Sequence, residues 1–320
     1  MTAIINSRPA EGDRPAITYR AAGDRHVLVE YGEMALDLEL NFFVTAVSAH
    51  LAEQPVPGLV EVAPGFRSLL LHHEPSLIDR KTLIEAMEEV HDAQQSVRSL
   101  VIPSRLITLP IAFDDSESRE AVHRYATTIR QEAPNVRDNS NIGYIVEYNG
   151  LPDPEALYAM VTGTTWWNAY TGFFPGLPFM FPLDPRNAIT VPKYNPTRTW
   201  TAEGAVGIGG PCVAIYPVEA PGGYQLFGRT VPIYDILARH DVFRSDPILI
   251  RPGDRVRFLR VTEDQLLEVR RDVLDNRYEY MIEDDPFHVT DYLTRAAEVQ
   301  AEARTLRTAR EAAAALMEVP

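Results

Sequence analysis

The sequence predicts an α+β protein in which a small layered domain of strands and helices precedes a domain built mainly of strands. Between residues 17 and 112, short β-rich runs alternate with two amphipathic helical patterns. From residue 164 to residue 260 the chain is rich in glycine, proline, aromatic and β-branched residues, in short runs divided by turns. The last part is rich in alanine, glutamate and arginine, which are good helix formers. We therefore expect an α/β sandwich, then a closed β-barrel or β-sandwich, then a long carboxyl-terminal helix.

The first domain is predicted at residues 16–113, behind a disordered leader at residues 1–15. The run His26–Glu30 alternates with a period of two, as a half-buried strand does. Apolar residues recur at helical spacing from Met34 to Glu53, and the prolines and glycine that follow end this helix. The element order is ββαββαβ, with both helices on one face of a sheet. The predicted strands cover residues 17–20, 26–30, 59–63, 68–73 and 106–112, and the predicted helices cover residues 34–53 and 75–97.

The second half of the chain is divided by its change in composition. Residues 114–163 are predicted to form a helical connector, and residues 164–285 the strand-rich barrel domain. Residues 286–320 follow as a carboxyl-terminal helix, with the helical pattern running from Asp291 to Met317. The apolar stripe of this helix is broad and weak. The helix therefore either packs on its own barrel domain or extends toward another subunit, and both alternatives stay open.

Composition excludes several classes of protein. The chain has 320 residues, 45% hydrophobic and 23% charged, as is typical of a globular protein. No apolar run is long enough for a transmembrane helix, and we expect no secretory signal in the polar first residues. The single cysteine, Cys212, excludes a disulfide framework and favours a reducing, cytoplasmic location. The net charge of −15 disfavours nucleic acid and anionic membranes as partners.

Common cofactor and metal motifs are missing from the sequence. It contains no G-x-x-x-x-G-K-[ST] loop and no dinucleotide fingerprint, and no helical pattern follows the glycine-rich residues 207–210. It also lacks the H-E-x-x-H helix of zinc enzymes. His72 and His73 are adjacent at the end of a predicted strand, where neighbouring side chains point to opposite faces. We therefore predict no metal site, and no ATP or NAD site of these kinds.

The densest concentration of unusual residues lies between residues 171 and 230. Lysine occurs only at Lys81 and Lys193, so the lysine in this segment is a candidate functional residue. The same loops carry amides, aromatic rings, arginines and glycines that allow close approach of a ligand to the backbone. Such a barrel mouth suits an anionic, planar, amide-like small molecule. The residues concerned are Lys193, Tyr194, Asn195, Arg198, Gly222, Gly223, Tyr224, Gln225 and Arg229.

Several motifs occur in one order and resemble a known family. They are YGEMALDL (31–38), PGFRSL (64–69), LDPR (183–186), KYNPTRTW (193–200), AVGIGG (205–210) and APGGYQLFGRT (220–230). These runs are similar to allophanate hydrolase subunit 1, also called the B subunit of 5-oxoprolinase. The KYNPTRTW run and the helical carboxyl end most resemble the carboxyltransferase domain of urea carboxylase. The resemblance implies an α+β domain before a cyclophilin-like β-barrel. The predicted fold is thus a ferredoxin-like α/β sandwich, a cyclophilin-like β-barrel and a long carboxyl-terminal helix.

The resemblance implies one half of a biotin-dependent carboxyltransferase, which moves CO₂ from carboxybiotin to a urea-like amide nitrogen. The implied partners are an allophanate hydrolase subunit 2-like carboxyltransferase subunit, a biotin carboxylase and a biotin carrier, with ATP used by a partner. Neither Lys81 nor Lys193 has the flanking methionines of a biotinylation site, so biotin is expected on another chain or domain. The alternatives are the B subunit of an ATP-dependent 5-oxoprolinase, and a non-catalytic regulator that inhibits a kinase.

This chemistry needs negative charge stabilised on the ureido oxygen of biotin and a proton removed from the acceptor nitrogen. We assign the anion to Lys193 or Arg198, with backbone N–H donors from residues 207–210 and 222–223. No general base stands out, and Glu219 is the nearest candidate. The GFFPGLPF run (172–179) resembles an oxoprolinase pattern, so urea, guanidine, another amide and 5-oxoproline all stay open as acceptors. The catalytic candidates are Lys193, Arg198 and Tyr224, and the substrate-binding candidates are Tyr194, Asn195, Gly209, Gly210, Gly222, Gly223 and Gln225.

Overall fold

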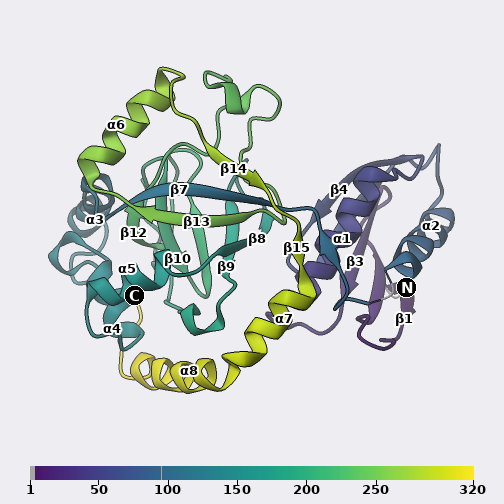
Figure 1. The fold of residues 1–320 in the computed structure, drawn as a ribbon, viewed down its shortest axis with the longest axis horizontal. Helices are drawn as coiled ribbons and strands as arrows, with labels where there is room; N and C mark the ends of the chain where they lie inside the picture. Colours follow the sequence, from purple (N-terminus) through teal and green to yellow (C-terminus); the bar gives the residue numbers. More distant parts are fainter. Residues whose placement is uncertain (1–3, 95) are drawn as a thin grey trace. The chain divides into compact units, whose positions relative to one another are not determined.

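The computed structural model describes residues 4–94 and 96–320, and the chain divides into two compact units (Figure 1). The first unit comprises the residues up to Arg105 together with Asp284–Arg295. The second unit comprises Leu106–Glu283 and Ala296–Pro320. Each unit has its own sheet and its own buried core, so each is described separately.

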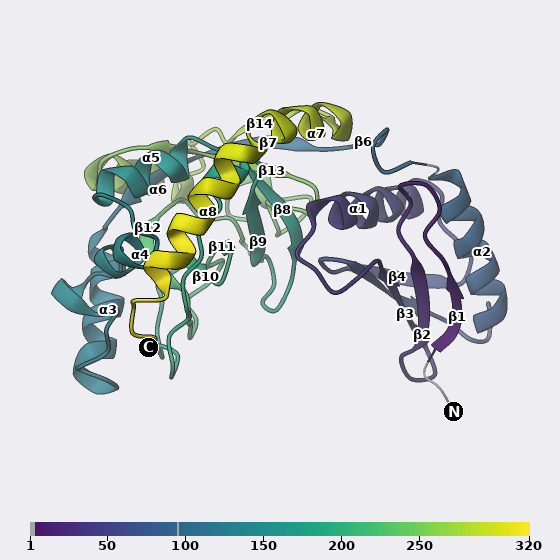
Figure 2. The same ribbon diagram turned by 90° about the horizontal axis from the view of Figure 1, so that it is seen from below.

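The first unit is a five-stranded antiparallel sheet with two helices on one face (Figure 2). On β3, every second side chain (Val27, Val29 and Tyr31) is fully buried, which is the alternation that the sequence predicted. The helices begin later than predicted because Asp37 and Asp79 cap them. The strand order is β1 (Ile4–Arg8), β2 (Ile17–Ala21), β3 (His26–Tyr31), β5 (Ser68–His73) and β4 (Leu59–Pro64), and the helices are α1 (Leu38–Glu53) and α2 (Arg80–Ala93).

The core of this unit is organised around one buried histidine. His91 of α2 has no exposed surface; its Nδ1 lies 2.9 Å from the hydroxyl of Tyr19 and its Nε2 lies 2.8 Å from the hydroxyl of Tyr31. The ring of Phe43, from α1, stacks on the imidazole with 6.1 Å between centroids. Both helices therefore contact the same face of the sheet at this point.

The carboxyl-terminal part of the chain returns to the first unit. The short strand β15 (Phe287–His288) pairs antiparallel with β6 (Val101–Ile102). The ring of Phe42 lies 5.0 Å from that of Phe287 and 5.1 Å from that of Tyr292, measured between centroids. Phe42 is completely buried in this aromatic cluster, so the core of the first unit contains residues from both ends of the sequence.

Two expectations for this region are wrong. Residues 4–8 of the expected disordered leader form strand β1, while residues 1–3 lie outside the described part of the chain. This strand escaped notice because its side chains are mostly polar and exposed; its partners come from α2, where Asn6 bonds to Glu88 and Arg8 to Asp92. The strand expected at 106–112 exists as β7 (Arg105–Phe113), but it belongs to the barrel and not to the sandwich.

In the second unit, seven strands pair into a closed barrel. β7 closes it, because β7 pairs antiparallel with β12 on one side and parallel with β13 on the other. A further strand, β14 (Met281–Asp284), adds to β7 outside the ring. The ring order is β12 (Gln225–Arg229), β10 (Ala205–Gly209), β11 (Cys212–Ile215), β9 (Pro178–Pro182), β8 (Trp166–Thr171), β13 (Arg255–Arg260) and β7.

The expected helical connector is present but is not a separate piece. Its residues Ile142, Ile145 and Leu157 are buried in the same apolar core as the barrel strands. The helices of this region are α3 (Ser116–Thr128), η1 (Arg137–Asn139), α4 (Ile142–Tyr148) and α5 (Pro154–Thr162). Further along the chain lie η2 (Pro185–Asn187), η3 (Asp241–Phe243) and α6 (Glu263–Leu274).

The expected single carboxyl-terminal helix is interrupted. It forms α7 (Val289–Glu298) and α8 (Gln300–Ala314), with a turn at Val299. α8 packs on the barrel unit: Arg310 Nη1 donates to the carbonyl oxygens of Arg186 and Ala188, each at 2.8 Å. Of the two alternatives for this helix, packing on its own barrel domain is seen for α8, whereas the residues up to Arg295 belong to the first unit. Within the described residues, no helix has the length and apolar character needed to cross a membrane.

Candidate functional site

A cavity of about 390 Å³ opens between loops of the barrel. Three sequence motifs meet there: the GFFPGLPF run, the KYNPTRTW run and the APGGY part of the 220–230 run. The lining residues are Phe173, Phe174, Leu177, Phe179, Lys193, Thr197, Ala214, Tyr216, Pro221, Gly222, Gly223 and Tyr224. The loops that the sequence predicted to form one site therefore do converge on one opening.

One cation and one tyrosine ring face each other in this cavity. The Nζ of Lys193 lies 5.2 Å from the centroid of the Tyr224 ring, and the lysine side chain is exposed. Burial raises the pKa of the Tyr224 hydroxyl well above its usual value, so this group stays neutral and can donate a hydrogen bond. The Tyr224 ring lies against Gly209, where an added Cβ would be 2.4 Å from a ring carbon. Glycine at 209 is therefore required by the ring and not by a ligand.

The buried Arg198 connects two of the loops that line the cavity. Its side chain is almost completely buried, at 1% exposure; Nη1 donates to the carbonyl oxygen of Tyr224 at 2.6 Å and Nη2 to the hydroxyl of Thr201 at 3.2 Å. Its backbone pairs with Gly222, the N–H of each residue donating to the carbonyl of the other, at 2.9 and 3.1 Å. Arg198 thus fixes the position of residues 222–224 relative to the KYNPTRTW run.

A second layer of buried polar groups supports these loops. The hydroxyl of Tyr194 accepts a hydrogen bond of 2.6 Å from Asn141, and its ring stacks under the Arg198 guanidinium at 4.4 Å. Gln225 accepts from Asn135 at 2.9 Å and donates to the carbonyl oxygen of Pro192 at 2.8 Å. These side chains bond to one another and to the backbone inside the fold, with Asn135 Oδ1 the exception that has no partner, so they hold the loops in place.

The structure separates the predicted site residues into two groups. Lys193, Gly222, Gly223 and Tyr224 line the cavity. The remaining candidates do not. Three of them are buried and bonded within the fold, and Asn195 is exposed outside the lining. Gly209 and Gly210 end and follow β10, where Gly210 turns the chain with a φ of +59° and donates to Val191. The candidates outside the lining are Tyr194, Asn195, Arg198, Gly209, Gly210 and Gln225.

Sequence reasoning missed the aromatic half of this cavity. Phe173, Phe174 and Phe179 come from the GFFPGLPF run, and Tyr216 follows β11. Phe173 is 88% exposed and has a left-handed φ of +69°, an unusual backbone conformation for a residue with a side chain. In the sequence this run stands out only for its family resemblance. Two adjacent phenylalanines in a Gly/Pro-rich loop are the signal that could have indicated an exposed aromatic contact.

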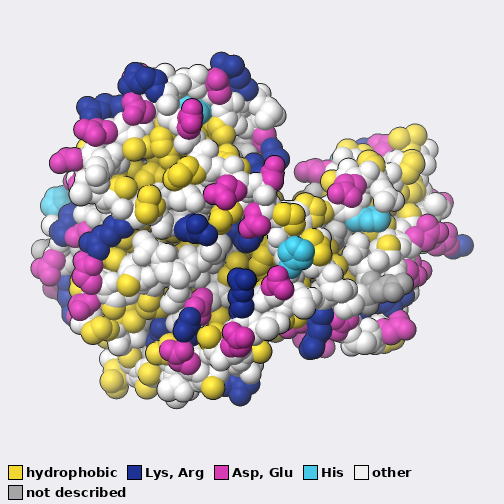
Figure 3. Space-filling view, viewed as in Figure 1, with side chains coloured by type: hydrophobic (Ala, Val, Ile, Leu, Met, Phe, Trp, Pro, Cys, Tyr) yellow, Lys and Arg dark blue, Asp and Glu magenta, His cyan; other side chains and the backbone are white. Residues whose placement is uncertain are grey.

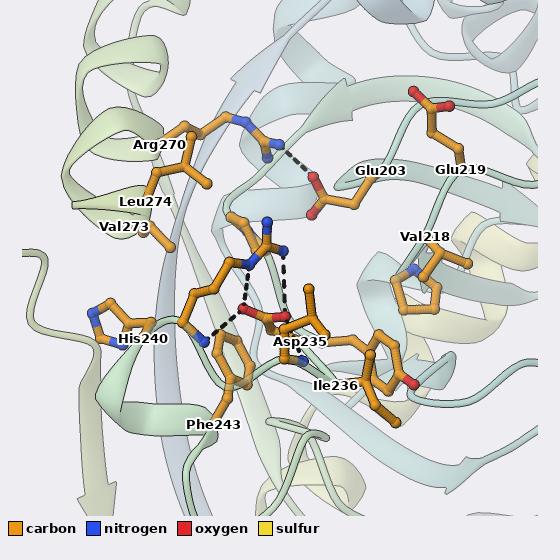
Figure 4. A pocket seen from close by; sticks show the side chains of 15 residues that line it. Glu203, Val218, Glu219, Asp235, Ile236, His240, Phe243, Arg270, Val273 and Leu274 are labelled. Atoms are coloured by element: carbon orange, nitrogen blue, oxygen red, sulfur yellow. Dashed lines mark hydrogen bonds and ion pairs between the residues drawn. The ribbon is translucent and has the colours of Figure 1, made fainter. Parts of the chain in front are cut away.

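A second cavity, of about 400 Å³, lies between α6 and the loops after β11 and β12 (Figure 4). Four of its charged groups form two ion pairs: Arg270 with Glu203, and Arg239 with Asp235 at 2.9 Å. Glu219 lines this cavity and not the one beside Lys193. The nearest candidate for a general base is therefore displaced from the predicted site, because residues 217–219 and 221–223 face different cavities.

The remaining candidate motifs have structural explanations. His72 stacks on His26 with 4.7 Å between centroids, while the buried His73 has its Nδ1 3.1 Å from the carbonyl oxygen of Ile78, so the two rings lie on opposite faces of the sheet. Within residues 4–94 and 96–320, no group of three or more His, Cys, Asp or Glu side chains is placed to hold a metal ion. On the face shown in Figure 3, basic side chains are scattered among acidic ones.

The described residues thus form a closed barrel with a loop cavity lined by one lysine. Comparison with family models makes the class specific: the model for the carboxyltransferase domain, subdomain C and D, matches residues 17–243. The chain belongs to this family of carboxyltransferase domains, which confirms the resemblance inferred from its motifs. The mixed α+β fold with its closed barrel agrees with that assignment.

Two kinds of relative match the chain. The urea amidolyase of Lachancea kluyveri is 34% identical over 279 residues, which cover 87% of this chain and 15% of the relative. The B subunit of the 5-oxoprolinase of Escherichia coli O157:H7 is 30% identical over 236 residues, which cover 71% of this chain and 93% of the relative. The crystal structure of the Kluyveromyces lactis urea carboxylase superposes with a TM-score of 0.83 at 33% identity, covering 98% of this chain and 28% of that one. The chain thus spans a small part of the urea-processing relatives.

Proposed function

We propose that this chain is one half of a biotin-dependent carboxyltransferase that moves a carboxyl group to a nitrogen of a urea-like amide together with a partner subunit. The observation that carries the proposal is the cavity in which Lys193 faces Tyr224 among aromatic rings. A single cation in a largely apolar cavity suits a ligand with one negative charge. The carboxyltransferase family and the similarity to a urea carboxylase supply the reaction class.

The residues of this chain divide the chemistry between them. Carboxybiotin, when bound, would supply the carboxyl group from its ureido nitrogen. The C–N bond to biotin would break as the C–N bond to the acceptor forms, with the proton of the acceptor nitrogen passing to the biotin nitrogen. Lys193 stabilises the negative charge on the ureido oxygen as that bond breaks. The neutral hydroxyl of Tyr224 is bonded to the buried Cys212, so Tyr224 contributes the face of its ring beside Lys193. Gly222 lets Tyr216 pack closely in the wall of the cavity, since a Cβ at Gly222 would be 2.3 Å from the Tyr216 hydroxyl.

The same proposal includes the partners. We place biotin on a carrier, and the use of ATP on a biotin carboxylase, outside this chain, with an allophanate hydrolase subunit 2-like protein as the second carboxyltransferase half. The supporting observations are that one relative is named as a subunit and that the chain covers only 15% of a urea amidolyase. The cytosol, which the single buried cysteine favours, is the proposed location.

The test uses the chain assembled with its partner subunits, the biotin carrier and ATP. Lys193→Ala is expected to lower carboxyl transfer to the acceptor by about 10²- to 10³-fold, because it removes one preorganised charge from the transition state. Carboxylation of biotin itself should be unchanged. Lys81→Ala is the matched control, since Lys81 is the other lysine and its side chain is 87% exposed on α2. Normal transfer by Lys193→Ala would overturn the proposed site.

A second candidate function is that of the B subunit of an ATP-dependent 5-oxoprolinase. The GFFPGLPF run and the 93% coverage of the bacterial 5-oxoprolinase B subunit favour it. Avidin separates the two functions, because it sequesters biotin. Acceptor-dependent ATP hydrolysis that avidin blocks supports the carboxyltransferase, whereas hydrolysis that depends on 5-oxoproline and is indifferent to avidin supports the oxoprolinase.

A further inference from the structure

We propose that Gln225 is a positioning residue, which sets the register that places Lys193 opposite Tyr224. The inference rests on the proposed function, because it concerns how the cation assigned to carboxyl transfer is held. It goes beyond that function by giving a part in the reaction to a side chain that has no exposed surface and cannot itself touch a substrate.

Two loop segments meet beside the cavity, and the side chain of Gln225 makes one of three successive contacts between them. Residue numbers rise along one segment as they fall along the other, so the two segments run antiparallel. The middle contact is the one between the lysine and the tyrosine ring. The three contacts join the N–H of Tyr194 to the carbonyl oxygen of Gly223 at 2.7 Å, the Nζ of Lys193 to the centroid of the Tyr224 ring at 5.2 Å, and the Nε2 of Gln225 to the carbonyl oxygen of Pro192 at 2.8 Å.

The partners of the Gln225 amide determine its orientation. The carbonyl oxygen of Pro192 only accepts hydrogen bonds, so Nε2 faces it, and Oε1 accepts from the Nδ2 of Asn135 at 2.9 Å. Asn135 is held in turn by Asn141, whose Nδ2 donates to the Asn135 carbonyl oxygen at 2.6 Å. Gln225 and Asn135 are both completely buried, so water does not compete for these bonds. The amide of Gln225 is therefore a fixed donor to the residue that precedes the lysine.

The bond to Pro192 matters because the ammonium of Lys193 is not fixed by an ion pair within the cavity. None of the described residues that line the cavity is acidic. The ammonium faces the Tyr224 ring instead, so its position follows from the backbone that carries it. A pairing displaced by one residue would put Pro192 or Tyr194, and not the lysine, opposite that ring. By holding Pro192 in place, Gln225 prevents this displacement and keeps the charge preorganised.

Gln225 and Arg198 act on different members of the facing pair. Arg198 donates to the carbonyl oxygen of Tyr224 at 2.6 Å, so it fixes the segment that carries the ring. Gln225 belongs to that same segment, but its side chain reaches across to Pro192 and fixes the segment that carries Lys193. Removal of the Gln225 donor therefore frees the lysine while the ring stays anchored. The transfer step that depends on the lysine is accordingly the measurement that reports on Gln225.

The experiment measures steady-state transfer by the chain assembled with its partner subunits, the biotin carrier and ATP. Gln225→Met keeps the length of the side chain and removes the donor to Pro192. Its kcat is expected to fall about 10- to 100-fold, because a displacement of about 1 Å can cost about 10²-fold. The KM values for the carboxyl donor and for the acceptor should stay close to those of the wild type, because Lys193 acts on charge that develops as the bond breaks.

The matched control is a buried amide in the other unit. Asn41 has no exposed surface and donates to the carbonyl oxygen of Phe66 at 2.8 Å. Asn41→Leu should therefore lower the melting temperature, as the loss of any buried donor does, and keep the kcat of the wild type. Melting curves of both variants, recorded on the assembled complexes, separate an effect on stability from an effect on transfer.

A double-mutant cycle shows whether Gln225 acts through Lys193. In the Lys193→Ala background there is no ammonium left to position, so adding Gln225→Met should lower kcat no further. Asn135→Ala provides a milder test from the other side of the amide. It leaves the donor to Pro192 in place but removes the group that fixes it, so its kcat should lie between those of the wild type and Gln225→Met.

The outcomes distinguish this inference from the proposed function. A wild-type kcat in Gln225→Met, with or without a lower melting temperature, would overturn the inference and leave the proposed function standing. A loss that is undiminished in the Lys193→Ala background would overturn it too, by showing an effect that bypasses the lysine. If Gln225→Met does not assemble, Asn135→Ala is measured in both backgrounds and judged by the same two results. Normal transfer by Lys193→Ala alone would overturn the proposed site, and this inference with it.

Discussion

The buried histidine of the first unit should make that unit sensitive to mild acid. His91 has no exposed surface, and burial, reinforced by the nearby Arg8 and Arg14, lowers its pKa from 6.5 to about 3. The neutral imidazole has one N–H and one acceptor nitrogen, and the hydroxyls of Tyr19 and Tyr31 accommodate both. In the unfolded chain the ring binds a proton at about pH 6.5, whereas in the folded chain it does not until the pH is near 3.

The sign and the size of the effect follow from these two values. The unfolded state binds more protons below pH 6.5, so the contribution of His91 is fully present above that pH and is lost as the pH falls toward 3. Each pH step of one costs about 1.4 kcal/mol, so the unit loses about 2 kcal/mol at pH 5 and about 5 kcal/mol near pH 3. Losses of this size are a large part of the stability of an ordinary domain.

Native-state hydrogen exchange of backbone amides in β2 and β3 reports the free energy of unfolding of this unit. We compare wild type with His91→Gln at pH 7.5 and pH 5, where most carboxylates of the unfolded chain are still ionised. The variant is expected to be less stable at pH 7.5, and its deficit should shrink by about 2 kcal/mol at pH 5. Asp13, Glu30 and Asp92 also have lowered pKa values, but both proteins contain them, so their contribution cancels. An equal loss of stability in the two proteins between these pH values would refute the reasoning.

Two further predictions concern the support of the cavity. Arg198→Met should lower the free energy of unfolding of the barrel unit by about 2–3 kcal/mol, because the carbonyl of Tyr224 and the hydroxyl of Thr201 lose a buried donor; urea unfolding followed by tryptophan fluorescence measures it. Arg124→Met removes a half-exposed arginine stacked on Trp200 and should lower the free energy of unfolding far less. Equal losses in the two variants would contradict the role of Arg198 in fixing the position of residues 222–224. Gly222→Ala should displace Tyr216 and raise the donor KM, whereas Gly143→Ala, in open space on α4, should be harmless or slightly stabilising, as melting curves and steady-state kinetics will show.

Elements that a local sequence pattern defines could be predicted from the sequence. The helical spacing in residues 34–53 and the Gly/Pro-punctuated strands after residue 164 correspond to α1 and to the barrel. The membership of β7 could not be predicted, because an apolar strand pattern does not state which sheet the strand joins. The same limit applies to β1, where the side chains of Asn6 and Arg8 bond to residues of α2 that are distant in the sequence.

The location of the candidate site could be predicted from the sequence, but the roles of its individual residues could not. Lys193 and Tyr224 do face one cavity, yet Arg198 and Gln225, from the same loops, are buried under it. An arginine or amide in a loop serves a ligand or the backbone with the same donors, and only its burial distinguishes the two roles. The contribution of Phe173 was invisible for a related reason, since neither its φ nor its exposure is encoded in a periodic pattern.

The pairing of β15 with β6 affects how the protein folds during translation. Phe42 is synthesised before the barrel strands, whereas Phe287 and Tyr292, which complete its aromatic cluster, are synthesised after them. During translation, part of the core of the first unit therefore stays exposed while the barrel strands are synthesised. Exposed apolar surface of this kind promotes chaperone binding or misassembly. A nascent chain arrested before residue 287 would thus lack part of the core of the first unit, although most of that unit has already been synthesised.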